Sequence, residues 1–216
     1  MDQTGILSKK DILERVESGD IVFTPPLDIF QPQVDAVDIR LGFTFQVPKR
    51  WKMTKKGREQ ITIDPMNRDD SHNYDVVTLE HGQTFELLPH EWVRACSLEK
   101  VKIPGDLISI MFPRSSSSRD GLSVDITGPV DAHYEGFLII PITNNTDQPY
   151  TLYPGVRIAQ LVFSTLTNKT DFTKSRWAGT DVVINVKPEK DKREVELIRS
   201  GNLKELKKEF LLELKK

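Results

Sequence analysis

Short apolar runs separated by turn-forming residues dominate the chain between residues 20 and 165. The runs are rich in β-branched and aromatic side chains, and Gly, Pro, Asn or Asp bounds most of them, which is typical of strands. Many short strands with frequent turns predict a sandwich or barrel-like β fold and not a series of βαβ units. The clearest expected strands are 37–47, 92–103, 107–112, 137–143 and 157–164.

A helical pattern precedes this β region. Residues 8–18 begin with Ser8, a residue type that often caps a helix, and Asp11 three positions later resembles the second half of a capping box. Gly19 favours the end of the helix, because glycine readily adopts the conformation that follows a last helical turn. We therefore expect a short helix whose apolar face carries Ile12, Leu13 and Val16.

The C-terminal part of the chain has a different composition. Residues 187–216 are rich in Lys, Glu and Leu, and they predict two short helices that separate at Ser200 and Gly201. An apolar stripe favours docking on the chain's own domain or on a neighbouring subunit, and the lysines leave phosphate contact as an alternative. The stripe consists of Leu203, Leu206, Phe210, Leu211 and Leu214.

Length and composition favour one main domain. With 216 residues, of which 38% are hydrophobic, the chain can bury one sizeable core, whereas two full domains would be crowded. We expect this domain to cover residues 1–180 and the helical extension to cover 187–216. Residues 47–75 are polar and lack an apolar pattern, so they predict an exposed insertion.

The charge balance argues against several partners. A net charge of −2 and an isoelectric point near 6.1 give no electrostatic basis for binding duplex nucleic acid. No apolar run approaches the roughly 20 residues of a membrane helix, and no secretory signal is visible at the N-terminus. The single Cys96 excludes an internal disulfide and a CxxC zinc site. We expect a cytoplasmic protein without a nucleic-acid or membrane partner.

The densest group of polar side chains lies at residues 113–122, PRSSSSRDGL. Arg114 and Arg119 flank four serines, and guanidinium groups with small hydroxyl donors suit the oxygens of a polyphosphate. The backbone amides of a serine run can also approach an anion closely, because no bulky side chain blocks them. A polar surface loop explains the same composition equally well, so the residues alone leave both interpretations open.

A second candidate lies at residues 128–136, GPVDAHYEG, where a compact turn would present Asp131, His133 and Tyr134 together. A carboxylate can orient water or accept a bond from a sugar hydroxyl, and a tyrosine ring can stack on a sugar or base. An aspartate in such a turn also commonly bonds its own backbone, and His133 favours a packing or surface role over a general base. The HxE and PCxxC signatures of zinc deaminases are absent, as is a GxSxG nucleophile elbow.

Five segments, taken in order, resemble the dCTP deaminase and dUTPase superfamily. Among them PRSS with RIAQL is the strongest pair, and the N-terminal helix and DIRLG resemble the dCTP deaminase branch. The resemblance covers roughly residues 6–180 and implies a distorted β-barrel or jelly-roll-like dUTPase fold. It also implies a homotrimer with active sites between subunits, which binds a deoxynucleoside triphosphate (dUTP or dCTP) whose Mg²⁺ is held mainly by the phosphates. The segments are 6–26, 31–42, 113–122, 130–136 and 153–163.

On the phosphate side, the resemblance assigns roles to residues of two segments. Arg114, Ser115 and Ser116 match the motif that holds the phosphates. Arg119 matches the second arginine of the deaminase form of that motif, which we count as a candidate catalytic residue. Asp38 matches the aspartate of the first motif, near the metal and phosphates.

On the sugar and base side, Asp131 matches the carboxylate at the sugar 3′-hydroxyl, which in dUTPases also activates the attacking water. Tyr134 matches the aromatic residue that packs on deoxyribose and excludes a 2′-hydroxyl. Gln160 lies in the RIAQL motif, whose glutamine is associated with the nucleotide site, and Arg176 and Trp177 are possible lid contacts. The backbone of the strand after Tyr134 would read the pyrimidine edge.

Two departures from the family pattern bear on the reaction. Deaminases of this superfamily carry a glutamate five residues after the glycine of this strand, and it moves protons at cytosine C4. Counting from Gly136 gives Pro141, which has no ionisable group, and neither Ile140 nor Ile142 substitutes for it. The glycine-rich C-terminal motif of ordinary dUTPases is also missing, and residues 175–181 resemble the shorter closing segment of the deaminase branch.

Three interpretations of function are therefore open. The first is a dUTP diphosphatase, which forms dUMP and pyrophosphate, because cleavage of a phosphoanhydride does not need a base-directed glutamate. The second is a dCTP deaminase with a displaced acid, and the third is a catalytically inactive nucleotide-binding sensor. A proline inside a strand also predicts that its nitrogen faces no ladder partner or lies at a bulge.

Overall fold

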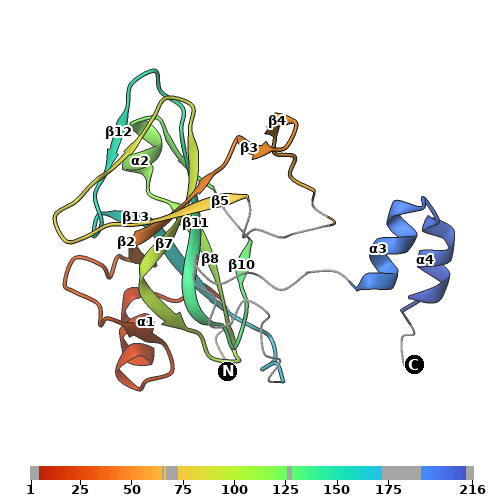
Figure 1. Cartoon of the computed structure of the whole chain (residues 1–216). Coiled ribbons are helices and arrows are strands. Elements are labelled where there is room, and N and C mark those ends of the chain that lie inside the picture. Colours follow the sequence, from red (N-terminus) through yellow and green to blue (C-terminus); the bar gives the residue numbers. More distant parts are fainter. Residues whose placement is uncertain (1–4, 65, 67–72, 126–127, 172–190, 213–216) are drawn as a thin grey trace.

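Antiparallel pairing joins the strands into one large curled sheet and two small two-stranded ones (Figure 1). A computed structural model describes residues 5–64, 66, 73–125, 128–171 and 191–212. The mainly β fold expected from the sequence is confirmed. The strands are β1 (Val22–Thr24), β2 (Val37–Pro48), β3 (Trp51–Thr54), β4 (Gly57–Gln60), β5 (Tyr74–Thr78), β6 (Phe85–Leu87), β7 (Trp92–Lys102), β8 (Leu107–Pro113), β9 (Leu122–Val124), β10 (Pro129–Val130), β11 (Glu135–Asn144), β12 (Tyr150–Leu152) and β13 (Arg157–Thr165).

The two longest strands determine the shape of the large sheet. Its order is β10-β8-β13-β2-β7-β11-β9, with β1 added to β7 and β5 added to β2. The register of β2 against β7 shifts between Leu41 and Phe45, and that of β11 against β7 shifts between Phe137 and Ile139. Such irregularities increase the local twist and bend the strands, so the sheet curls around a core that includes the fully buried Phe45.

The N-terminal helix α1 (Lys9–Glu17) is capped as its sequence predicts. The Ser8 side chain accepts a bond from the backbone N–H of Asp11, and the Asp11 carboxylate accepts one from the N–H of Ser8. Ile12 is buried and Val16 packs against the core, whereas Leu13 is 40% exposed. The predicted apolar face is therefore narrower than expected, because only a stripe of this short helix reaches the sheet.

Residues 192–209 form the helices α3 (Lys192–Arg199) and α4 (Leu203–Glu209), which pack on each other and stand apart from the sheet in Figure 1. Asp191 caps α3, and Ser200 and Gly201 separate the two helices. Of the predicted apolar stripe, Leu206 is partly buried, three residues are exposed, and Leu214 lies outside the described residues. No described helix is long and apolar enough to cross a membrane.

The predicted insertion at 47–75 contains the small hairpin β3–β4, whose side chains are mostly exposed. Its two ends belong to the large sheet: Val47 and Pro48 extend β2, and the buried Tyr74 begins β5. Arg199 of α3 forms an ion pair of 3.0 Å with Asp64, just after the hairpin.

Two helices mark opposite ends of the curled sheet (Figure 1). At one end, Arg15 of α1 pairs with Asp106 at 2.7 Å, just before β8 begins. At the other end, β8 leads directly into the short helix α2 (Ser115–Arg119). Strand β8 therefore spans the distance between these two ends.

Pro141 lies in a regular part of β11, so of the two alternatives expected for a proline in a strand, the bulge does not apply at this residue. Continuing the pairing of β11 with β9 by one residue places Asp125 opposite Pro141, and the Asp125 N–H donates to the Pro141 carbonyl at 3.0 Å. The N–H and C=O of one residue point to the same side of an antiparallel strand. The proline nitrogen thus faces the residue just past the end of β9, and the ladder with β7 loses no bond.

Candidate active site

The carboxylate of Asp38 is the centre of a buried polar cluster on β2. It is completely inaccessible to solvent. Its Oδ2 lies 3.3 Å from Arg114 Nε and 3.1 Å from Arg157 Nη1, and its Oδ1 accepts a bond of 2.8 Å from Gln160 Nε2. The cluster therefore joins the segment at 31–42, the serine-rich segment and the RIAQL segment in one place.

Strand register explains how these residues meet. Gln160 on β13 lies directly opposite Asp38 on β2. Arg157 is three positions from Gln160, so regular alternation would send the two side chains to opposite faces of the sheet. The register shifts between Arg157 and Ala159, and this irregularity turns both side chains toward Asp38. Sequence reasoning assigned no role to Arg157 because a bulge of this kind is not visible in the alternation of polar and apolar residues.

The loop before β2 closes one side of the cluster. Arg157 Nη1 donates to the carbonyl of Phe30 at 2.7 Å, and Gln33 Nε2 donates to the same carbonyl at 2.8 Å and to Asp38 at 3.3 Å. One carboxylate thus faces two guanidinium groups, whose side chains are 26% and 30% exposed. Two partly exposed guanidinium groups side by side suit an anion arriving from solvent.

The serine-rich segment is a short helix, which the sequence patterns did not predict. Residues 115–119 form α2, and Arg114 occupies its N-cap position in an extended conformation. Ser115 and Ser116 are exposed beside Arg114, whereas Ser117 is buried and Arg119 is exposed in the last turn. The four serines are therefore not equivalent, because helical periodicity turns one of them inward.

The turn between β10 and β11 carries the second group of predicted residues. Asp131 is exposed, and its carbonyl accepts a bond from the N–H of Tyr134 at 3.2 Å. Tyr134 is only 7% exposed, and its hydroxyl donates to the carbonyl of Phe137 at 2.5 Å. His133 has φ +63° and packs where a Cβ on Gly105 would lie. The His133 ring therefore packs against Gly105, and only a small part of the Tyr134 surface is available to a ligand.

These two groups lie at opposite ends of β8. The pairing of β10 with β8 places Asp131 beside Ile108, and Arg114 follows β8 six residues after Ile108. At about 3.3 Å per residue, the separation is roughly 20 Å. A water on Asp131 and a phosphate on Arg114 of the same chain cannot meet at one phosphorus atom.

The predicted Mg²⁺ has no ready-made protein site among the described residues, which contain no group of three or more His, Cys, Asp or Glu side chains able to hold a metal. The carboxylate of Asp38 is already used by two arginines and a glutamine. The residues present therefore fit an ion that arrives with the oxygens of a triphosphate and do not fit a protein cage. Arg176 and Trp177 lie outside the described residues.

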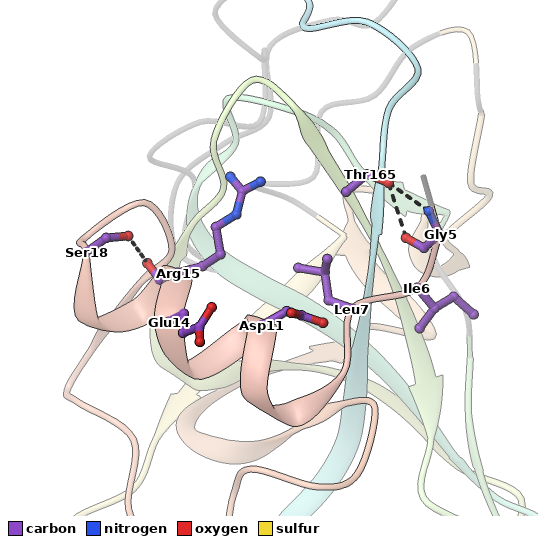
Figure 2. A pocket seen from close by; sticks show the side chains of 8 residues that line it. All are labelled: Gly5, Ile6, Leu7, Asp11, Glu14, Arg15, Ser18 and Thr165. Carbon is purple, nitrogen blue, oxygen red and sulfur yellow. Dashed lines mark hydrogen bonds between the residues drawn. The ribbon is translucent and has the colours of Figure 1, made fainter. Parts of the chain in front are cut away.

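A cavity of about 610 Å³ lies elsewhere, between α1 and the N-terminal segment (Figure 2). None of the predicted site residues lines it. It is bordered by Asp11 and Glu14 on one side, and Arg15 is engaged with Asp106.

Comparison with known proteins matches the part of the chain that contains the five segments named above. Residues 6–166 match the family model described as dCTP deaminase-like. A protein from Methanobrevibacter smithii, named dCTP deaminase, dUMP-forming, is 39% identical over 168 residues, which cover 77% of this chain and 83% of that protein. A dCTP deaminase from Haloarcula marismortui is 36% identical over 169 residues, with coverage of 77% and 83%.

A solved structure has the same fold. The 2′-deoxycytidine 5′-triphosphate deaminase from Agrobacterium tumefaciens superposes with a TM-score of 0.59 at 22% identity, over 75% of this chain and 49% of that chain. The match thus spans about half the length of that protein. Fold and motif order define a β-barrel protein of the dCTP deaminase and dUTPase superfamily. Within this superfamily, the chain belongs to the dCTP deaminase-like family.

Proposed function

We propose that this chain hydrolyses a pyrimidine deoxynucleoside triphosphate, with dUTP as the first choice, to the monophosphate and pyrophosphate. The observation that carries the proposal is Pro141. Proline offers no ionisable group at the strand position where the deaminase pattern requires a glutamate. The phosphate side of the site, in contrast, has Arg114 and Arg157 paired with Asp38. Relatives at 33–39% identity are named dCTP deaminase, dUMP-forming, and dUMP is also the product of dUTP hydrolysis.

In the proposed reaction, a water bound to Asp131 attacks the α-phosphorus. The Asp131 carboxylate accepts the proton of the water, the bond between the α-phosphorus and its bridging oxygen breaks, and pyrophosphate leaves. Arg114 and the hydroxyls of Ser115 and Ser116 bind the phosphate oxygens, and Arg119 adds positive charge from the end of α2. Bound Mg²⁺ would neutralise charge on the triphosphate.

The separation of Asp131 from Arg114 supports a site that is shared between chains, within the homotrimer that we propose. A mixing experiment tests this directly. Asp131→Asn and Arg114→Gln are each expected to be inactive as pure proteins, and a mixture that is unfolded and refolded together should regain activity. Recovery is expected because some sites then combine an intact Asp131 with an intact Arg114. Sedimentation should give a trimer, and a lack of recovery in mixed trimers would contradict a shared site.

The substrate test measures two products separately. The protein with Mg²⁺ is given dUTP or dCTP, and pyrophosphate and ammonia are followed in parallel. We expect pyrophosphate from dUTP, with loss of this activity in Asp131→Asn and no loss in the exposed control Asp35→Asn. Tight binding of dUTP with neither product would instead favour a nucleotide-binding sensor.

Deamination of dCTP is a second candidate, favoured by the position of Asp125. This exposed carboxylate lies directly opposite Pro141, and side chains of directly opposed residues share one face of a sheet. Asp125 could therefore supply a displaced acid next to the missing glutamate. Ammonia from dCTP that disappears in Asp125→Asn would support this function. Pro141→Glu should change dUTP hydrolysis by only a modest factor, and complete loss would give this position another role.

A further inference from the structure

Glu99 is a buried carboxylate that the proposed reaction does not use. It lies on β7 and is only 1% exposed. The register between β7 and β11 shifts across this stretch, between the pairs of Lys100 and Cys96. A carboxylate in such a position is costly unless hydrogen bonds satisfy it, so its partners indicate what it does.

Both oxygens of Glu99 accept bonds from elements that carry the Asp38 cluster. Oε2 accepts from the backbone N–H of Arg40 at 3.0 Å, and Oε1 accepts from Gln31 Nε2 at 2.8 Å. The same Gln31 nitrogen donates to the carbonyl of Asp38 at 2.9 Å, and the N–H of Asp38 donates to the carbonyl of Gln31 at 2.9 Å. Gln31, itself 1% exposed, thus connects Glu99 to the backbone of Asp38.

The charge of Glu99 favours the orientation in which the amide of Gln31 is held. An ionised carboxylate only accepts hydrogen bonds, so the NH₂ group of Gln31 must face it. The amide oxygen of Gln31 then faces the other way and accepts from the N–H of Asp28 at 3.0 Å. A neutral amide at position 99 could accept from only one of its two donors, because its NH₂ group would face the other donor.

We propose that Glu99 is a positioning residue for the phosphate site: it orients Gln31, which holds Asp38 in the register that aligns Arg114 and Arg157. This inference deepens the proposed function and rests on it. Burial raises the pKa of Glu99, although the Arg40 N–H, the Gln31 amide and the charge of Arg40 act against that rise. A carboxylate whose ionisation is opposed in this way is a poor choice for stability alone, which agrees with a role in alignment.

The test compares two substitutions at buried positions of β7. Glu99→Gln keeps the size of the side chain and removes its charge. Ser97→Ala is the matched control, because Ser97 Oγ donates to the Glu99 carbonyl at 2.6 Å and accepts from the Leu138 N–H at 2.9 Å, on the side of β11. We expect Glu99→Gln to raise the KM for dUTP about tenfold with little change in kcat. Ser97→Ala should lower the melting temperature and leave the affinity for inorganic pyrophosphate, which has no base, unchanged.

Binding of inorganic pyrophosphate, measured by calorimetry, provides a readout that does not depend on turnover. Glu99→Gln should weaken it about tenfold. Gln31→Met breaks the same link from the side of the loop and replaces Glu99→Gln in the test if that variant does not fold. The double variant should bind pyrophosphate no more weakly than the weaker-binding of the two single variants. An unchanged affinity in a folded variant, or an equal loss in Ser97→Ala, would overturn the inference. If wild type binds pyrophosphate but turns over neither nucleotide, the proposed function fails while Glu99 is still tested.

Discussion

Replacing Asp38 with asparagine is expected to destabilise the protein strongly, although it changes one atom. The carboxylate is fully buried and faces Arg114 at 3.3 Å and Arg157 at 3.1 Å. The amide of the introduced asparagine would have no charge to offset the two guanidinium groups. One of its sides would also present N–H donors to a cation.

The size of the effect is set by how much hydration the arginines can regain. Removing one partner of a buried ion pair costs about 3–5 kcal/mol. The arginine side chains are 26% and 30% exposed, and the amide oxygen of the asparagine can still accept the bond from Gln160. We therefore expect a loss of about 2–3 kcal/mol in the free energy of unfolding. For a chain of this length that corresponds to a melting temperature lower by roughly 5–10 °C.

Urea denaturation and thermal melting, both followed by circular dichroism, measure this loss. Asp35→Asn is the matched control, since it changes the same atom on an exposed side chain three residues away and should stay within about 0.5 kcal/mol of wild type. Adding Arg157→Gln to Asp38→Asn should cost less than the sum of the single changes, because it removes one of the unpaired cations. Wild-type stability for Asp38→Asn, or strict additivity in the double variant, would refute the ion-pair argument.

Three further predictions concern stability. Ser8→Ala removes the cap of α1 and should lower the free energy of unfolding by about 1 kcal/mol in urea titrations; no change would mean that the cap is not used in solution. Gly42→Ala would place a Cβ 2.7 Å from the backbone carbonyl oxygen of Ser97, so it should lower the free energy of unfolding by about 3 kcal/mol. A normal melting temperature would contradict this packing. Burial raises the pKa of Asp106, but the hydrogen bond and charge of Arg15 outweigh it and hold that pKa below its ordinary value. The stability from this pair is present above the ordinary pKa of an aspartate and is lost as the pH falls through the lowered pKa of Asp106. Wild type should therefore lose stability below about pH 4 more steeply than Asp106→Asn. Equal acid dependence of the two proteins in urea titrations would argue against the pair.

Local patterns in the sequence predicted most of the secondary structure. The β-branched and aromatic runs at 37–47 and 157–164 reappear as β2 and β13, and the capping pair at Ser8 reappears at the start of α1. These features depend on neighbours within a few residues, so a one-dimensional pattern contains them. The short helix α2 was not foreseen, because a run of serines has no periodicity of its own.

The candidate site also combines features that local sequence predicts with features that depend on the tertiary structure. The sequence by itself determined which residue types could handle a phosphate or a water, namely Arg114 with its serines and Asp131. Only the tertiary structure decided that Arg157 joins Gln160 at Asp38, because a shift in strand register turns its side chain to the same face. It also decided that Asp131 lies at the far end of β8 from Arg114. Register and bulges depend on which strands pair across the sheet, and no local pattern in the chain specifies that pairing.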